Sequence, residues 1–180
     1  MRGYFAIGVE GLSKPMNFGN LIRSAHAFGA SFFFTVDSGK HLSRIPRSDT
    51  SKSAEHIPYY PWESADEMLF PKGCSLVGVE LTDEAIELPS FRHPIRAAYV
   101  MGPERGSLST DMQARCDLIV KIPTQFCINV ATAGAIIMYD RVKSLGGFPE
   151  RPVWPRGDIE EKQKVVFGGP RYSGGKRLPS

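Results

Sequence analysis

Short apolar segments alternate along this chain with segments that repeat their apolar residues at helical spacing. The apolar segments are rich in β-branched and aromatic residues, which favour strands. They cover residues 4–9, 31–36, 75–81, 97–101 and 118–122. The helical segments cover residues 20–28, 64–69, 109–115 and 128–145. This alternation predicts an α/β fold built on a parallel sheet.

Glycines and capping residues indicate where these helices begin and end. Gly29 and the Gly146-Gly147 pair follow helical segments and are expected to stop them. Ser64 with Glu67 resembles a capping box at the start of a short helix. Residues 38–62 are polar, basic and rich in turn formers. We therefore expect a long loop there with at most a helical turn, and such loops are often binding elements.

Length and charge divide the chain unevenly. A chain of 180 residues with 42% hydrophobic content can bury one compact core. We expect one domain over residues 1–147 and a basic, partly mobile extension over residues 148–180. Residues 1–150 hold 15 Lys and Arg against 16 Asp and Glu, whereas residues 151–180 hold seven against three. A mobile basic arm suits a polyanion such as RNA, although its composition taken alone favours a solubilising tail.

Several classes of protein do not fit this composition. No run of about 18 apolar residues is present, and residues 1–10 lack the features of a signal peptide. We therefore expect a cytoplasmic protein without a membrane span. The cysteines and histidines lack CxxC, HxxxH and HExxH spacing. They are Cys74, Cys116, Cys127, His26, His41, His56 and His93. We expect reduced thiols, no bound metal, and histidines at the surface or in turns.

Three segments place polar and small residues where predicted strands end and helices follow. Their sequences are NFGNLIR (17–23), MGPERG (101–106) and IPTQFCINV (122–130). In α/β folds, ligand sites lie at the carboxyl ends of the strands. The second segment lacks GxGxxG spacing, so a nucleotide-binding oxidoreductase is not expected. The three segments together predict a site for a polar ligand.

These segments resemble the three signature motifs of the SpoU-type (TrmH-like) RNA 2′-O-ribose methyltransferases of the SPOUT superfamily. The likeness extends over residues 3–146 and includes the order and spacing of the motifs. The matched positions are Asn17, Gly19, Asn20, Arg23, Gly102, Pro103, Glu104, Gly106, Leu108, Ile122, Pro123, Ile128, Asn129 and Val130. Two family serines are replaced, by Cys127 and Ala131, so two hydroxyl donors are missing.

The resemblance implies a single-domain SPOUT fold with a C-terminal trefoil knot that binds S-adenosylmethionine. It also implies an antiparallel homodimer in which the long C-terminal helix packs against the partner chain. In such a dimer, residues of both chains form the site. Ala131, Ala135, Ile136 and Tyr139 in that helix suit close packing. An ordinary buried core helix would use the same residues.

The same resemblance implies roles for individual residues. The expected catalytic residues are Arg23, Asn17, Glu104 and Asn129. The expected cofactor-binding residues are Leu81, Gly102, Ile122, Cys127 and Ile128. Arg23 is expected at the reacting ribose, either as a base or, more simply for a permanently protonated guanidinium, as a clamp for a phosphate or alkoxide. The asparagines could instead be caps or turn residues, and Glu104 a favourable charge at a helix N-terminus.

RNA is the expected partner, with tRNA slightly preferred over rRNA. Phosphate contacts are expected from Arg23, Arg44, Arg47 and Lys52, and such contacts position RNA without specifying its sequence. The missing serines leave an alternative open. The chain could be a non-catalytic RNA-binding or assembly protein that retains the fold.

Overall fold

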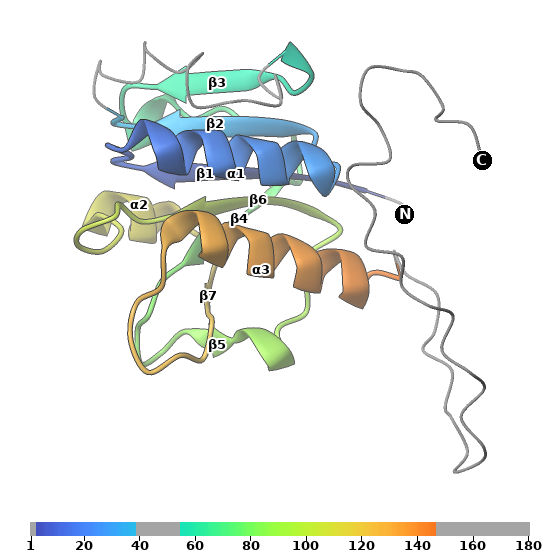
Figure 1. Ribbon diagram of the computed structural model, residues 1–180. Helices are drawn as coiled ribbons and strands as arrows, with labels where there is room; N and C mark the ends of the chain where they lie inside the picture. Colours follow the sequence, from blue (N-terminus) through green and yellow to red (C-terminus); the bar gives the residue numbers. More distant parts are fainter. Residues whose placement is uncertain (1–2, 39–54, 147–180) are drawn as a thin grey trace, which may run out of the picture. The chain divides into compact units, whose positions relative to one another are not determined.

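A computed structural model describes residues 3–38 and 55–146 of the chain. Its centre is a seven-stranded sheet in which every pairing is parallel, in the order β3-β2-β1-β6-β4-β7-β5 (Figure 1). The strands are β1 (Tyr4–Glu10), β2 (Phe32–Val36), β3 (Tyr59–Trp62), β4 (Ser75–Val79), β5 (Ile86–Glu87), β6 (Arg96–Met101) and β7 (Leu118–Lys121). The predicted α/β class with a parallel sheet is confirmed.

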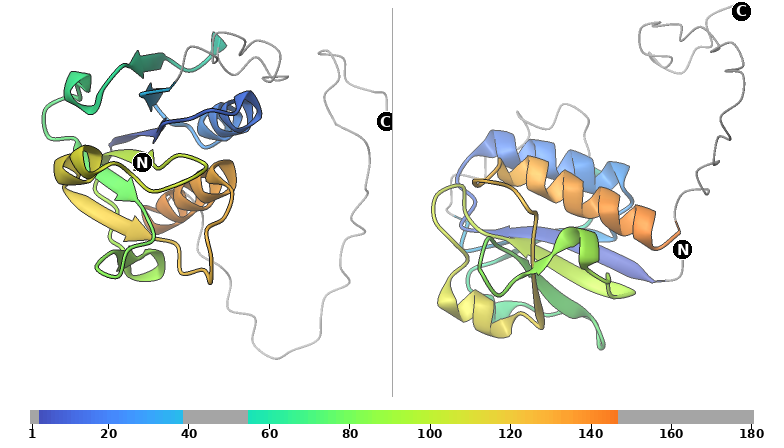
Figure 2. Two further views of the ribbon diagram at one scale, coloured as in Figure 1. Left: turned by 90° about the vertical axis from the view of Figure 1, so that its left-hand side faces the viewer. Right: turned by 90° about the horizontal axis from the view of Figure 1, so that it is seen from below.

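Helices cover both faces of this sheet. The two long helices, α1 (Pro15–Ala27) and α3 (Val130–Ser144), lie side by side on one face, and α2 (Thr110–Arg115) lies on the other (Figures 1 and 2). Two 3₁₀ turns, Ala65–Glu67 and Leu88–Ser90, complete the described elements. The long helices begin at the carboxyl ends of strands, which places their first turns at the edge where α/β folds build sites.

Each face of the sheet has its own hydrophobic cluster. Successive side chains of a strand point to opposite faces, so Ile7 packs with Leu21 and Ile137 under the long helices, whereas Ala6 packs with Met112 on the other face. A methyl group added at Gly134 of α3 would overlap the side chain of Leu21. This glycine therefore lets α1 and α3 approach each other closely.

Two element boundaries differ from the sequence prediction. Helix α1 begins at Pro15 rather than at residue 20, because proline at the first helical position has no donor to lose and a favourable φ. The predicted helix over 64–69 is a single 3₁₀ turn, and Ser64 makes no capping hydrogen bond. Glu67 Oε2 instead accepts from the backbone N–H of Glu63 at 3.0 Å. The capping-box prediction was therefore wrong.

The two outermost strands were not predicted. β3 lies within the segment expected to be a loop, and it contains Pro61, which disfavours a central strand. β3 pairs only with β2 at one edge of the sheet, where proline is tolerated. β5 is two residues long, too short to show periodicity, and it pairs with β7 at the opposite edge.

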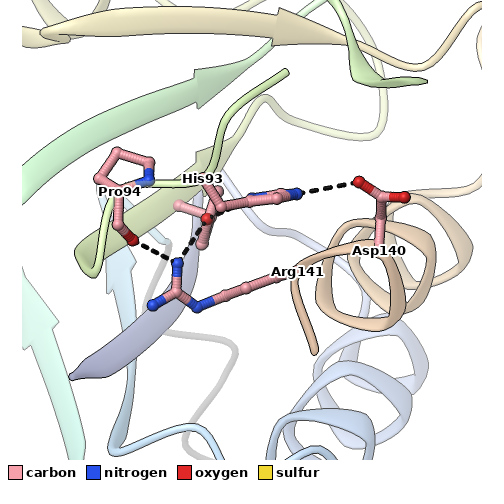
Figure 3. A network of polar contacts seen from close by, with 5 residues as sticks. His93, Pro94, Asp140 and Arg141 are labelled. Atoms are coloured by element: carbon pink, nitrogen blue, oxygen red, sulfur yellow. Dashed lines mark hydrogen bonds and ion pairs between the residues drawn. The ribbon is translucent and has the colours of Figure 1, made fainter. Parts of the chain in front are cut away.

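A buried polar network fixes the C-terminal half of α3 to the amino ends of the central strands (Figure 3). Arg141 is fully buried and donates to the carbonyl oxygens of Tyr4, Pro94 and Ile95 at 2.6–3.2 Å, and to the hydroxyl of Tyr99 at 3.0 Å. Buried charges are stable in proteins when they are paired or hydrogen-bonded, and Nε is the one guanidinium nitrogen without a hydrogen-bond partner among the described residues. The guanidinium therefore anchors α3 at the end of the sheet opposite the strand carboxyl ends.

His93 belongs to the same network, which corrects its predicted place at the surface or in a turn. Its Nε2 lies 3.0 Å from Asp140, and its Nδ1 lies 2.7 Å from the Tyr99 hydroxyl. Because a carboxylate can only accept, Nε2 carries the proton and Nδ1 accepts from the tyrosine. Burial lowers the pKa of His93 below its usual 6.5, although the hydrogen bond to Asp140 opposes this shift. Burial therefore favours the neutral imidazole in the folded chain.

Several predictions concern parts of the chain that the structure does not describe. The C-terminal extension, the domain boundary after residue 147, and Arg44, Arg47 and Lys52 all lie outside residues 3–38 and 55–146. The knot and the homodimer stay predictions. Within the described ranges, no helix is long and apolar enough to cross a membrane. The same ranges contain no cluster of His, Cys, Asp and Glu suited to a metal ion.

Candidate active site

A cavity of about 350 Å³ opens at the carboxyl ends of β4, β6 and β7, beside the first turns of α1 and α3. Its walls bring together eight residues predicted from the sequence, of which seven come from the three motifs and Leu81 follows a predicted strand. They are Asn17, Leu81, Gly102, Glu104, Ile122, Cys127, Ile128 and Asn129. The volume lies within the range of small-molecule sites, which is about 300–1,000 Å³.

A chain of side-chain hydrogen bonds joins the three motifs at this cavity. The amide nitrogen of Asn129 donates to Oδ1 of Asn17 at 3.0 Å. The amide nitrogen of Asn17 in turn donates to Oε1 of Glu104 at 3.0 Å. Each amide uses both its acceptor and its donor, because Asn129 Oδ1 also caps α3. The three polar residues are therefore held in fixed orientations relative to one another.

Glu104 accepts four hydrogen bonds. Besides Asn17, the donors are the backbone N–H and the hydroxyl of Ser13 and the backbone N–H of Lys14, at 2.9–3.1 Å. Partial burial of the carboxyl raises its pKa, but the hydrogen bonds from Asn17, Lys14 and Ser13 together outweigh burial and lower it. Glu104 is therefore an ionised acceptor that fixes the loop between β1 and α1.

Asn129 has two structural roles at once. Its Oδ1 accepts from the backbone N–H of Ala131 at 2.9 Å and of Thr132 at 3.3 Å, which makes it the N-cap of α3. Its Nδ2 provides the bond to Asn17. The cap considered as an alternative from the sequence is present, and the same side chain also faces the cavity.

Gly102 is also required by packing within the chain. A methyl group at this position would lie 3.0 Å from the backbone nitrogen of Leu108 and 3.3 Å from Oε2 of Glu80. The glycine therefore allows the loop after β6 to fold back against the end of β4. This packing shapes the cavity wall whatever ligand occupies it.

Some residues of the cavity wall were not predicted. Lys14, Glu80 and Thr124 line it and carry polar groups. Glu80 directly follows β4 and could have been found from that position alone. Thr124 donates to the carbonyl of Phe126 at 2.9 Å and so shapes the loop after β7.

Arg23 does not line the cavity in this single chain. It lies on the exposed surface of α1, six residues after Asn17, which corresponds to about 9 Å along the helix axis. The guanidinium of Arg23 makes no hydrogen bond or ion pair with any other residue in the described ranges. Its role at the reacting ribose stays a prediction.

Two curated relatives are 30% identical to this chain over 146 residues each. One is the tRNA (guanosine(18)-2′-O)-methyltransferase TARBP1 of Mus musculus, matched over 75% of this chain and 9% of that protein. The other is an uncharacterized tRNA/rRNA methyltransferase of Archaeoglobus fulgidus, matched over 76% of this chain and 63% of that protein. The chain spans less than two thirds of either relative.

The fold is similar to solved methyltransferase structures. The SpoU methyltransferase AviRb from Streptomyces viridochromogenes superposes with a TM-score of 0.72 at 21% identity, over 82% of this chain and 62% of that one. An AdoMet-bound rRNA methyltransferase from Sinorhizobium meliloti superposes with a TM-score of 0.71 at 20% identity, over 81% and 58%. These similarities show that this chain has the same fold as the two solved structures.

The model of the SpoU rRNA Methylase family matches residues 4–139, which is well over half of the chain. This match includes the three motifs and confirms the resemblance identified from the sequence. With its parallel sheet and the cavity where the motifs meet, the chain belongs to the SpoU rRNA Methylase family.

Proposed function

We propose that this chain transfers a methyl group from S-adenosylmethionine to a ribose 2′-hydroxyl of RNA in the cytoplasm, with tRNA favoured over rRNA. The observation that carries the proposal is the hydrogen-bonded series Asn129–Asn17–Glu104 at the cavity wall. It joins side chains from three separate motifs in one fixed arrangement. The similarity to a mouse tRNA methyltransferase and to an archaeal tRNA/rRNA methyltransferase supports an RNA substrate.

The cavity fits the proposed cofactor in size and in chemistry. Apolar side chains of Leu81, Ile122 and Ile128 offer a surface for an adenine ring, and polar groups lie beside them. The AdoMet-bound Sinorhizobium meliloti protein has the same fold, which supports this assignment. When bound, S-adenosylmethionine supplies a methyl group that is already activated by its positive sulfur.

The protein's contribution to such a reaction is orientation. Positioning two reactants can lower a barrier by about 7–11 kcal/mol in favourable cases. Glu104 holds Asn17, and Asn17 holds Asn129, so that their amide groups cannot rotate without breaking a hydrogen bond. We propose that Asn17 and Asn129 orient the ribose. Ionised Glu104 in turn keeps the two asparagines in place.

In this proposal Arg23 acts in the cavity of a second copy of the chain. The exposed surface of the two long helices includes Met16, Ile136 and Tyr139, which are 71%, 36% and 44% exposed. We propose that this surface forms the homodimer and brings Arg23 to the partner's cavity. There the guanidinium would grip an RNA phosphate or stabilise the developing alkoxide, because it cannot lose its proton to act as a base.

The replaced serines are compatible with activity. Ala131 is buried in the first turn of α3, and its backbone N–H is used by the Asn129 cap. Cys127 is exposed at the cavity wall. The described residues offer no observation that favours the non-catalytic alternative, since the polar series remains connected despite both replacements.

The decisive experiment is a methylation assay with the purified chain. Labelled S-adenosylmethionine is supplied with total tRNA or with rRNA, and the product is mapped by mass spectrometry of nucleosides. A 2′-O-methylated nucleoside in tRNA supports the proposal. Glu104→Gln should lower kcat/KM about 100-fold because it loosens the positioning, whereas the exposed Glu87→Gln should not. Absence of any cofactor-dependent methylation would refute the proposal.

A complementation experiment tests the dimeric site. Arg23→Ala and Glu104→Gln chains are each expected to retain at most about 1% of the wild-type activity, and they are coexpressed with two tags so that mixed dimers can be isolated. If Arg23 acts in the partner's cavity, each mixed dimer has one intact site, and a random mixture recovers about a quarter of the wild-type activity. A mixture that stays inactive would place Arg23 in the cavity of its own chain, and an active Arg23→Ala chain would place it outside the reaction.

A further inference from the structure

Glu80 directly follows β4 and lies half-buried in the cavity wall, and the proposed mechanism does not use it. Its Oε2 accepts from the backbone N–H of Leu108 at 2.7 Å, and its Oε1 accepts from the backbone N–H of Leu81 at 3.0 Å. These donors belong to two different loops of the site. The carboxylate is therefore held in one orientation beside Gly102.

Each oxygen of Glu80 has acceptor capacity left. An ionised carboxylate offers about four acceptor positions, and two are occupied by the backbone donors. No Lys or Arg in the described ranges forms an ion pair with Glu80. The carboxylate is therefore an oriented pair of acceptors at the cavity without a cation to satisfy it.

Glu104, the second carboxylate of the cavity wall, already accepts hydrogen bonds from the protein at all of its acceptor positions. Glu104 accepts four hydrogen bonds from the loop before α1 and from Asn17. Glu80 is thus the acidic side chain of the wall with acceptors to spare for a ligand. Its neighbour Leu81 is part of the apolar surface to which the adenine is assigned, so the sugar of the same nucleoside would lie close by.

We propose that Glu80 binds the two ribose hydroxyls of S-adenosylmethionine and selects a ribonucleoside cofactor over a deoxyribonucleoside. This inference rests on the proposed function. A carboxylate at the end of a strand suits a vicinal diol because its two oxygens can accept both hydroxyl protons. α/β dinucleotide sites use an acidic residue toward ribose for the same reason.

The test measures binding rather than activity. Calorimetry with the full chain compares S-adenosylhomocysteine with its 2′-deoxy and 3′-deoxy forms, for wild type and for Glu80→Gln. The wild type should bind each deoxy form about tenfold or more weakly, since a hydrogen bond to a charged acceptor is lost. Glu80→Gln should bind S-adenosylhomocysteine about tenfold more weakly and discriminate less between the three ligands. The exposed Glu84→Gln serves as the matched control.

The outcomes separate this inference from the proposed function. A wild type that binds all three ligands equally would overturn the role of Glu80 and leave the methyltransferase proposal standing. The same holds if Glu80→Gln weakens all three by one factor, because Glu80 would then only brace the loop through Leu108. A wild type that binds none of the ligands would overturn both. The wild-type comparison needs no variant, so it can overturn the role of Glu80 even if Glu80→Gln fails to fold.

Discussion

The side-chain amide of Asn129 donates a 3.0 Å hydrogen bond to the side-chain oxygen of Asn17, a residue 112 positions earlier in the chain. Asn17 lies in the first turn of α1, and Asn129 is the N-cap of α3. One hydrogen bond thus joins the starts of the two helices that border the cavity. The stability of α3 and the orientation of the site depend on the same asparagine.

Two substitutions of Asn129 separate these roles. Aspartate caps a helix as well as asparagine does, so Asn129→Asp should change the free energy of unfolding by only a few tenths of a kcal/mol. It cannot donate to Asn17, however, and we expect a large loss of methyl transfer. Asn129→Ala should lose the activity and also about 1 kcal/mol of stability. Urea unfolding and single-turnover methylation measure the two effects.

Thr132→Ala, at an exposed position in the first turn of α3, is the control for that pair. It should leave both stability and activity close to the wild type. If Asn129→Asp were fully active, the bond to Asn17 would have no part in the reaction.

Gly134 sets the distance between α1 and α3. Alanine normally favours a helix over glycine by about 1 kcal/mol, but here its methyl group would overlap the buried side chain of Leu21. We expect Gly134→Ala to lower the free energy of unfolding by about 1–3 kcal/mol. Urea unfolding measures the change.

A double variant identifies the cause of that loss. If the methyl group clashes with Leu21, then Leu21→Ala should cost less in the Gly134→Ala background than in the wild type. Strictly additive effects would show that the two positions are independent and that the clash is relieved elsewhere.

The neutral His93 predicts a pH dependence of stability. Its pKa is lowered in the folded chain, chiefly by burial, so the unfolded chain binds a proton more readily below pH 6.5. Well above pH 6.5 the imidazole is neutral in both states and contributes no pH dependence. The free energy of unfolding should therefore fall as the pH drops from 7.5 to 5.5.

The variant His93→Gln isolates the contribution of the imidazole to this pH dependence, because glutamine keeps a polar side chain that does not titrate. Thermal unfolding at both pH values should show a smaller difference for this variant than for the wild type. An equal difference would assign the pH dependence to other groups. The exposed His26 and His56 stack on each other with ring centroids 5.2 Å apart, and they are the described histidines to substitute next.

The three cysteines should differ in reactivity. Cys127 is exposed at the cavity, whereas Cys74 and Cys116 are half-buried. Burial raises the pKa of the Cys116 thiol to about 12 and also raises that of Cys74, so both carry little thiolate at neutral pH. Iodoacetamide should therefore label Cys127 first, as peptide mass spectrometry can show.

A cofactor in the cavity would protect that thiol. We expect S-adenosylmethionine to slow the labelling of Cys127, and Cys127→Ser to remove the fast labelling altogether. Labelling of Cys127 at the same rate with and without saturating S-adenosylmethionine would place the cofactor elsewhere.

The sequence was most informative about central elements and about the motif residues of the site. The strands later described as β1, β2, β4, β6 and β7 were predicted from apolar runs, because strands buried on both faces are apolar throughout. The edge strand β3 was missed, since Pro61 argues against a strand unless its position at the edge is known. The start of α1 was placed too late because the favourable position of Pro15 was overlooked.

Periodicity and motif order by themselves determined the fold class, the family resemblance and the identity of most residues around the cavity. Only the tertiary structure decided that Asn129 bonds to Asn17, that His93 is buried between Tyr99 and Asp140, and that Glu80 holds Leu108. The physical reason is the separation along the sequence over which each interaction acts. Backbone propensity and hydrophobic spacing act between neighbours in the chain, whereas a side-chain hydrogen bond depends on which distant atoms the packed sheet brings within about 3 Å.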